Sequence, residues 1–242
     1  MKKIITCFLV LTLVALASEA ATIDVTTIGS SGTVNGAIFF GIDPQSTGTG
    51  IIDPFLREQN NGTEYGVNTS VSSPPYNDKS GPWTHDLAVS SLAPINYGGV
   101  DYYSFFLDAN QIGNGPISLT TLKIFTSASA LATVAAVTTL VTTGSPLYDL
   151  GANVVNIAGN NGSGSGDMLL YIPRSLIGDT GYLYLYAGFG AGEGNYVSND
   201  GFEEWNAVTG TRITHSIPDG GTTAVLLGAA LSGLALLKRR AK

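Results

Sequence analysis

The sequence predicts an all-β protein, a single antiparallel β-sandwich of jelly-roll-like type, flanked by an N-terminal signal peptide and a C-terminal transmembrane helix. Three observations predict this class. The apolar stretches of the body are short and alternate with polar residues, as in strands that bury one face. Turn-forming residues separate these stretches, and 31 of the 242 residues are glycine. Each end of the chain carries a long apolar run, at 4–17 and at 222–237.

The N-terminus has the organisation of a secretory signal. Two lysines precede an apolar core at 4–17, and small residues follow at Ser18 and Ala20. A charged start, an apolar core and a small-x-small site are the parts of a cleaved export signal. We therefore expect cleavage between Ala20 and Ala21, which removes residues 1–20. The alternative is an uncleaved anchor, but the apolar core is short for a spanning helix.

The body of the chain, residues 21–212, is expected to form one extracellular domain. Nine apolar stretches predict strands in it: 22–26, 34–40, 87–90, 100–107, 119–126, 154–157, 168–172, 182–187 and 202–207. The stretch 128–141 mixes helix-favouring Ala and Leu with β-branched Val and Thr, and we predict a further strand there. Residues 173–177 begin with proline and predict a single helical turn.

One predicted strand alternates more clearly than the others. In extended backbone Tyr182, Tyr184 and Tyr186 share one face, and the two leucines between them share the opposite face. We favour leucines in the core and tyrosines in a cross-strand ladder. The alternative is an exposed aromatic row that stacks on sugar rings with Trp83 or Trp205, which would make the domain a glycan-binding module.

The charge of the body restricts its partners. Residues 21–216 contain sixteen Asp and Glu against five Lys and Arg, a net charge of −11. Such a surface disfavours nucleic acid and anionic lipid, and is compatible with divalent cations and neutral glycans. Cys7 is the only cysteine and lies in the predicted signal peptide, so the expected mature protein has neither a disulfide nor a thiol nucleophile.

Acidic residues in the predicted loops and strand ends allow two interpretations. Carboxylate oxygens are ligands that Ca²⁺ prefers, and the candidates for a calcium site are Asp53, Asp108, Asp167, Asp200 and Glu203. They would share one ion only where the fold brings them together. We favour turn chemistry instead, in which an Asp side chain accepts a hydrogen bond from a nearby backbone amide. Calcium is therefore a candidate cofactor, and no cofactor is certain.

We predict that the protein is not an enzyme. The sequence contains neither Gly-x-Ser-x-Gly nor a P-loop, and His85 is the only histidine of the body. A polysaccharide hydrolase would need two carboxylates about 5 to 10 Å apart across a cleft. Glu203 and Glu204 are adjacent, so in a strand they would point to opposite faces.

Two arginines are expected to form internal salt bridges. Arg57 and Arg174 are among the few cations of the acidic body, and each lies in an apolar context. The candidate partners of both are Asp53 and one glutamate of the pair at 203–204.

The C-terminal segment, residues 213–242, has three parts. These are a short motif, Ile217-Pro218-Asp219-Gly220-Gly221; an apolar run at 222–237; and a basic end containing Lys238, Arg239, Arg240 and Lys242. A helix of the apolar run would be about 24 Å long against a hydrocarbon core of about 30 Å, a difference that snorkelling lysine and slight thinning of the bilayer accommodate. The basic residues predict a stop-transfer signal on the cytoplasmic side.

This tail resembles the PEP-CTERM class of sorting tails and is most similar to the VPDSG-CTERM variant. Ile217 stands where valine is usual and Gly220 where serine is usual. The resemblance implies recognition by an exosortase-type membrane protease, cleavage near the motif, and transfer of the body to the cell surface or the exopolysaccharide matrix. Segments of the body resemble a β-rich ectodomain that accompanies such tails, and this second resemblance implies no particular activity.

We therefore expect an exported cell-surface or exopolysaccharide-matrix protein with a structural or adhesive role. The membrane would hold it by the C-terminal helix until the protease releases it. A glycan-binding module is the first alternative and a polysaccharide hydrolase the second. Extracellular polysaccharide is a candidate partner, whereas nucleic acid is not expected.

Overall fold

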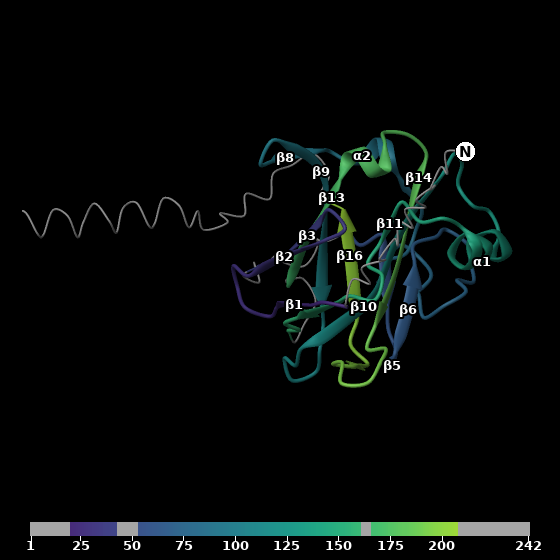
Figure 1. Cartoon of the computed structure of the whole chain (residues 1–242). Helices are drawn as coiled ribbons and strands as arrows, with labels where there is room; N and C mark the ends of the chain where they lie inside the picture. The colour runs from purple at the N-terminus through teal and green to yellow at the C-terminus, as the bar shows by residue number, and fades with distance from the viewer. Residues whose placement is uncertain (1–19, 43–52, 161–165, 208–242) are drawn as a thin grey trace, which may run out of the picture.

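A computed structural model describes residues 20–42, 53–160 and 166–207 of the chain. These ranges form two β-sheets that face each other (Figure 1). Most of the predicted signal peptide, the predicted sorting motif, the transmembrane helix and the basic end lie outside the described residues.

The first sheet, here called sheet A, contains seven strands. Across the sheet they are β1 (Thr22–Val25), β12 (Val154–Ile157), β10 (Ile117–Ser127), β14 (Tyr182–Phe189) and β6 (Glu64–Val67), with β11 (Tyr148–Asp149) beside β10 and β7 (Leu87–Ala88) beside β14. The pairing of β1 with β12 is parallel, and the other pairings are antiparallel. A 3-10 turn, η1 (Val89–Ser91), follows β7.

The second sheet, sheet B, also contains seven strands, all paired antiparallel. Across the sheet they are β2 (Ser31–Val34), β3 (Ala37–Gly41), β13 (Met168–Pro173), β9 (Val100–Ala109), β16 (Glu203–Ala207) and β4 (Leu56–Glu58), with β8 (Ile95–Tyr97) beside β9. A separate two-stranded ladder joins β5 (Asn61–Gly62) to β15 (Ser198–Asn199).

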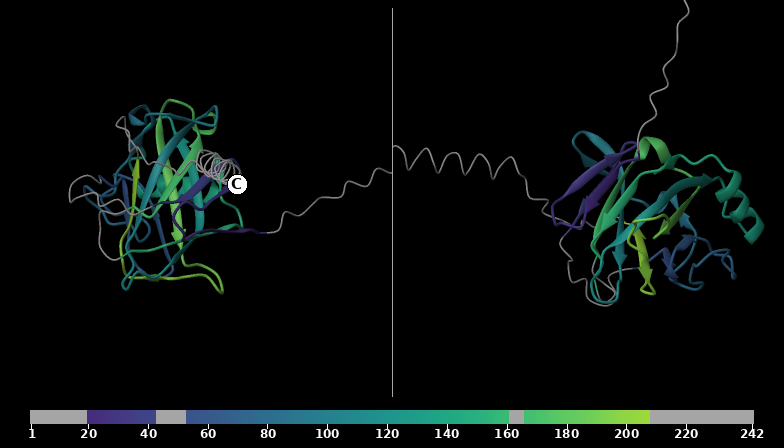
Figure 2. Two further views of the ribbon diagram at one scale, coloured as in Figure 1. Left: turned by 90° about the vertical axis from the view of Figure 1, so that its left-hand side faces the viewer. Right: turned by 60° about the horizontal axis from the view of Figure 1, so that its bottom comes forward.

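One apolar core lies between the two sheets. Leu122 and Leu185 of sheet A belong to the same buried cluster as Phe105 and Leu170 of sheet B, and all four side chains are 0% exposed. Full burial of such a side chain contributes about 1.5–3 kcal/mol. Figure 2 shows the two layers from two further directions. The prediction of a β-rich, mainly antiparallel protein is confirmed.

An irregularity in β10 keeps its apolar residues on the core side. The pairing of β10 with β14 changes register between Leu119 and Thr121. Side chains of a regular strand alternate, so Leu119 and Leu122, three positions apart, would face opposite sides of the sheet. The bulge adds one residue to β10 between the two leucines, so both side chains point to the core side of sheet A, where they are buried.

The stretch 34–40, predicted as one strand, contains the last residue of β2, a two-residue turn and most of β3. Asn35 and Gly36 have φ of 50° and 86°, which is the left-handed backbone that a two-residue hairpin needs. Register continues from Val34↔Ala37 to Ser31↔Phe40. The Asn-Gly pair was the available sequence signal, because Asn and Gly are the residues that adopt this backbone most readily.

The prediction of a strand at 128–141 is wrong, because residues Val134–Thr143 form helix α1. Thr133 caps the helix, accepting a hydrogen bond from the Ala136 amide at 3.2 Å. Val137 and Val141 are one turn apart and are buried against the outer face of sheet A. The helix lies outside the two layers (Figure 1). This packing outweighs the modest strand preference of Val and Thr.

The remaining predictions differ from the structure mainly at their ends. The other expected strands correspond to β1, β7, β9, β10, β12, β13, β14 and β16, although β7 gives way to η1 after two residues. The expected helical turn is α2 (Arg174–Ile177), and Pro173 is its N-cap. Strands β4, β5, β6, β8, β11 and β15 were not predicted, and each has only two to four residues.

We expect Leu122→Ala to lower the free energy of unfolding by about 2–5 kcal/mol, because it removes part of a fully buried side chain and leaves a cavity. The matched control is Ile112→Ala, since Ile112 is 68% exposed; its effect should stay within about 0.5 kcal/mol. Denaturant unfolding measures both. Equal effects of the two substitutions would contradict the described core.

Candidate functional site

The tyrosine strand does not form an open aromatic row. Leu183 and Leu185 lie in the core as predicted. Tyr184 is 0% exposed on the other face, and its hydroxyl accepts a hydrogen bond from the Leu131 amide at 2.7 Å and donates one to Asp86 Oδ1 at 3.0 Å. Burial raises the pKa of this hydroxyl above its usual value. The middle ring is therefore a structural anchor for the segment that leads into α1.

The flanking rings belong to the same covered face. Tyr182 and Tyr186 are half-buried and pack against the cluster that contains Tyr184 and α1. Tyr186 also stacks on Tyr65 at 5.9 Å between ring centroids and contacts Tyr76 at 5.2 Å. The arrangement is a cross-strand aromatic cluster, as favoured above.

The two tryptophans are not neighbours in any shared platform with these tyrosines. Trp205 is 0% exposed and lies in the core, on strand β16 of sheet B. Trp83 is 43% exposed and lies against Arg57, whose guanidinium carbon is 4.4 Å from the ring centroid. The proposed stacking residues therefore divide among the outer face of sheet A, the core and a surface loop.

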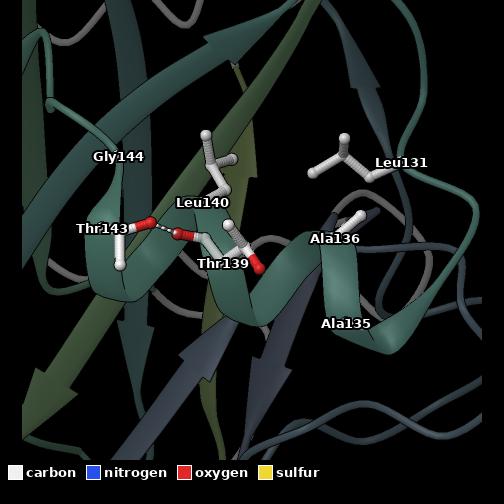
Figure 3. Close-up of a pocket in the computed structure, with 7 residues that line it drawn as sticks. All are labelled: Leu131, Ala135, Ala136, Thr139, Leu140, Thr143 and Gly144. Carbon is white, nitrogen blue, oxygen red and sulfur yellow. Dashed lines mark hydrogen bonds between the residues drawn. The ribbon is translucent and has the colours of Figure 1, made fainter.

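A shallow groove runs along α1. Figure 3 shows its lining, which comes from the helix and the segment before it: Leu131, Ala135, Ala136, Thr139, Leu140, Thr143 and Gly144. Thr143 Oγ1 donates to the Thr139 carbonyl at 2.8 Å, so this hydroxyl serves the helix rather than the groove. The lining carries no ionisable side chain. The groove offers shape and apolar contact but no charged group.

The five candidates for a calcium site lie in four places. Asp53 is exposed at the start of a described range, and Asp200 is exposed with a φ of 74°. Asp108 and Asp167 are buried near each other at the ends of β9 and β13. Glu203 is buried in β16. Within the described ranges, no three or more His, Cys, Asp or Glu side chains are placed to hold one metal ion.

The carboxylate of Asp167 is held by hydrogen bonds to the backbone and to a neighbouring side chain. Its carboxylate accepts hydrogen bonds from the Ala109 amide at 2.8 Å and from Asn160 Nδ2 at 2.7 Å. Burial raises the pKa of Asp167 to about 8, partly offset by these two hydrogen bonds, and the neighbouring Asp108 adds to the rise. The bonds join the end of β9 to the loop before β13, so Asp167 links distant segments of the chain rather than a single turn.

The structure brings together a set of carboxyl groups that the sequence did not indicate as a group. We call Glu58, Glu64, Asp78 and Glu203 the acidic cluster. Glu58 and Glu203 are register partners on β4 and β16 of sheet B, and Glu64 lies on β6 of sheet A, paired with Phe189 of the core. Asp78 comes from the long loop after β6 and forms a β-bridge with Glu58. The cluster therefore lies between the two sheets.

Few hydrogen-bond donors serve the acidic cluster. The Asn60 amide donates to Glu64 at 2.7 Å, the Val67 amide to Asp78 at 2.6 Å, and Gln111 Nε2 to Glu203 at 2.5 Å. Within the described part of the chain, five further oxygens have no hydrogen-bond partner: Glu58 Oε1, Glu58 Oε2, Glu64 Oε1, Asp78 Oδ2 and Glu203 Oε2. The nearest donors are the Trp205 indole, which lowers the pKa of Glu58, and the Ser198 hydroxyl, which lowers that of Glu64, and both are neutral.

Burial dominates the electrostatics of the acidic cluster. Glu58, Glu64 and Glu203 are 0% exposed and Asp78 is 8% exposed. Desolvation disfavours the charged form of a carboxyl group. It raises the pKa of Glu58 and Glu203 well above the usual value, and the neighbouring acids raise them further. Burial likewise raises the pKa of Asp78 to about 7.

Gly66 makes room for two members of the acidic cluster. A Cβ atom at this position would lie 2.6 Å from Asp78 Oδ1 and 2.8 Å from Glu58 Oε2. Both distances are shorter than van der Waals contact, so the two carboxyl groups occupy the space that any side chain at residue 66 would need. In the sequence, the only sign of this cluster is that Glu58 and Glu64 both precede Gly66 within eight residues. The contribution of Asp78, from a loop, is visible only in the fold.

Arg57 neutralises a different carboxylate. Its guanidinium forms a hydrogen-bonded ion pair with Glu204 and lies between the rings of Trp83 and Phe202. Glu204 and Glu203 are adjacent in β16, so they point to opposite faces, and the ion pair is separate from the acidic cluster. The predicted internal salt bridge of Arg57 is confirmed. Arg174 differs from its prediction, because its ion pairs with Asp179 and Asp101 are on the surface.

The two predicted processing regions are described only at one residue pair. Ala20 and Ala21 are exposed. The Ala21 amide donates to Asn153 Oδ1 at 2.9 Å, and its carbonyl accepts from the Val154 amide at 3.0 Å. Ser18, the motif 217–221 and the basic residues at 238–242 lie outside the described residues. No helix within the described ranges is long and apolar enough to cross a membrane.

Comparison with known proteins assigns the C-terminal segment. Residues 216–241 match the VPDSG-CTERM motif, the sorting tail of exosortase substrates, which confirms the predicted tail. The tail indicates an exported surface protein that an exosortase processes. No curated protein and no solved structure matches the chain.

We expect Tyr184→Phe to lower the free energy of unfolding by about 1–3 kcal/mol, because it leaves the Leu131 amide without its acceptor. The control is Tyr196→Phe, which removes the same hydroxyl from a ring that is 48% exposed. Thermal unfolding of both variants measures the difference. If Tyr184→Phe behaved like Tyr196→Phe, Tyr184 would not anchor this segment.

We expect Gly66→Ala to destabilise the protein by about 1–3 kcal/mol, since the added methyl group must displace buried carboxyl groups. Gly115→Ala is the matched control, because a Cβ at residue 115 meets no atom within 4 Å. Denaturant titration compares the two. A neutral Gly66→Ala would show that the cluster is not packed as described.

Proposed function

We propose that the mature protein is a structural or adhesive component of the cell surface or of the extracellular matrix, built as a single jelly-roll-like β-sandwich ectodomain. The observation that carries this proposal is the match of residues 216–241 to the VPDSG-CTERM motif, because such a tail marks a protein for export and exosortase processing. The order of export signal, ectodomain, motif, apolar run and basic end fits this route.

The route has three physical steps. The apolar core at 4–17 directs export and is removed after Ala20. The apolar run at 222–237 then halts in the membrane, with the basic end on the cytoplasmic side. Cleavage at 217–221 by an exosortase-type membrane protease releases the ectodomain. Pro218 keeps Ile217 extended and the two glycines are flexible, so the motif suits the cleft of a protease.

The ectodomain itself supports a structural or adhesive role rather than hydrolysis. Glu64 and Glu203, a pair of carboxyl groups that affect each other's pKa, are both 0% exposed. A hydrolase needs its acid and base open to substrate and water. The aromatic residues considered for glycan stacking are largely covered or separated, so their geometry does not favour the glycan-binding alternative.

We expect the native protein, isolated from its own host, to lack both residues 1–20 and the residues that follow the cleavage point within 217–221. Intact mass and cell fractionation measure this. Asp219→Ala should leave the full-length tail in the membrane fraction, because it alters the motif that the protease reads. Asp200→Ala, a change at an exposed carboxylate of the ectodomain, is the control and should be processed normally.

A full-length tail in the membrane fraction of the unaltered protein would overturn the sorting step and leave a single-pass anchor. Normal cleavage of Asp219→Ala would place recognition elsewhere in the tail. Release of the processed protein into the medium without any retention on cells or matrix would count against the structural or adhesive role.

A further inference from the structure

The acidic cluster raises a problem of charge that the proposed function does not address. Glu58, Glu64, Asp78 and Glu203 come from three strands and a loop and meet between the sheets. An ionised carboxylate without a partner is very costly to bury. Something must therefore neutralise most of the four groups in the folded protein.

The groups that face the cluster do not supply that charge. The titratable ones are Tyr186 from β14, Tyr76 from the loop after β6 and Asp200 beside β15, and the amide of Gln111 approaches from the loop after β9. Each is acidic or neutral. The guanidinium on β4 is that of Arg57, and it pairs with Glu204 on the opposite face of sheet B.

The contact between Glu64 and Glu203 identifies the neutralising species. The two carboxyl groups act on each other across the two sheets, because Glu203 lowers the pKa of Glu64 while Glu64 raises the pKa of Glu203. A carboxylate has only acceptor oxygens, so two carboxyl groups can share a hydrogen bond only when one carries a proton. Glu58 and Asp78 are also close to each other, because Oε2 of Glu58 and Oδ1 of Asp78 lie 2.8 and 2.6 Å from the position that a Cβ of residue 66 would take. The negative charge of Asp78 accordingly raises the pKa of Glu58.

We propose that protons hold the acidic cluster together, and that their loss as the external pH rises loosens β4 and β6 from the rest of the fold. An exported protein experiences the pH of its surroundings directly. Low pH should therefore keep β4 and β6 packed against the rest of the fold, and high pH should favour their separation from it.

The topology determines which strands respond. β4 is the three-residue edge of sheet B and pairs with β16, whereas β6 is the four-residue edge of sheet A and pairs with β14. Edge strands have fewer ladder hydrogen bonds to break than β16 or β14, which have neighbours on both sides. Repulsion between ionised Glu58, Glu64 and Glu203 therefore acts on two short edge strands, which can separate from β16 and β14.

The direction of the pH dependence follows from linkage. The pKa of each cluster member is higher in the folded protein than in the unfolded chain, so the folded state holds more protons. The stabilisation is complete below the unfolded values near pH 4 and is lost as the pH rises through the folded ones. Because the pKa of Asp78 is about 7, part of that loss falls in the neutral range.

Hydrogen exchange of the exported protein tests the proposal at the level of individual strands. The opening equilibrium of β4 and β6, corrected for the intrinsic exchange rate, should rise about tenfold per pH unit for each proton that only the closed form retains. Measurements from about pH 5 to pH 8, with chelator present, cover the range in which the carboxyl groups would ionise. Local exchange is needed because Asp167, elsewhere in the fold, also has a raised pKa.

Glu58→Gln removes one ionisable group from the cluster without changing its size, and it should reduce this pH dependence at β4 and β6. Glu64→Gln is the second variant, for use where the first does not fold. Glu193→Gln alters an exposed carboxylate outside the cluster and should leave the dependence unchanged.

Three results would overturn the proposal. Opening of β4 and β6 that does not depend on pH would remove the role of protons. An unchanged pH dependence in both cluster variants would assign it to other groups. Closure of these strands at alkaline pH by added calcium would show that a divalent cation, rather than protons, neutralises the cluster.

Discussion

The packing of two seven-stranded sheets over one apolar core is the interaction on which the rest of this protein depends. Leucine and isoleucine side chains of β10 and β14 meet the aromatic and aliphatic side chains of β9 and β13 in a single buried cluster. The described body contains no cysteine, so burial and hydrogen bonds must supply the stability that disulfides supply in many exported domains. Both the tyrosine face and the acidic cluster take their positions from this core.

The outer face of sheet A shows how the core sets its surroundings. Because Leu183 and Leu185 face inward, the tyrosines of β14 must face outward. Leaving all three tyrosine rings of β14 exposed to water would cost free energy, and α1 with the segment before it covers the ring of Tyr184. The tyrosine row, which the sequence alone allowed as a sugar-binding surface, is the surface against which α1 packs.

In the acidic cluster, by contrast, charged residue types are buried inside the fold. The body carries many more acids than bases, yet several carboxyl groups lie inside rather than on the surface. Gly66 provides the space and the two edge strands provide the positions. Buried ionisable groups seldom add stability, whereas they readily make stability depend on conditions. In an exported protein, we expect the external pH to act on the stability of this end of the domain through the acidic cluster.

The sequence by itself determined the destination of the protein and the class of its fold. The motif at 217–221 and the basic residues after 222–237 are linear signals, and a linear signal can be read without a structure. Alternation of apolar residues predicted most of the long strands, because the period of two is a local property. Tertiary structure alone decided the rest. The helix at Val134–Thr143 depended on a distant surface against which Val137 and Val141 could pack, and the acidic cluster depended on residues up to 145 positions apart meeting between two sheets, which no local pattern encodes.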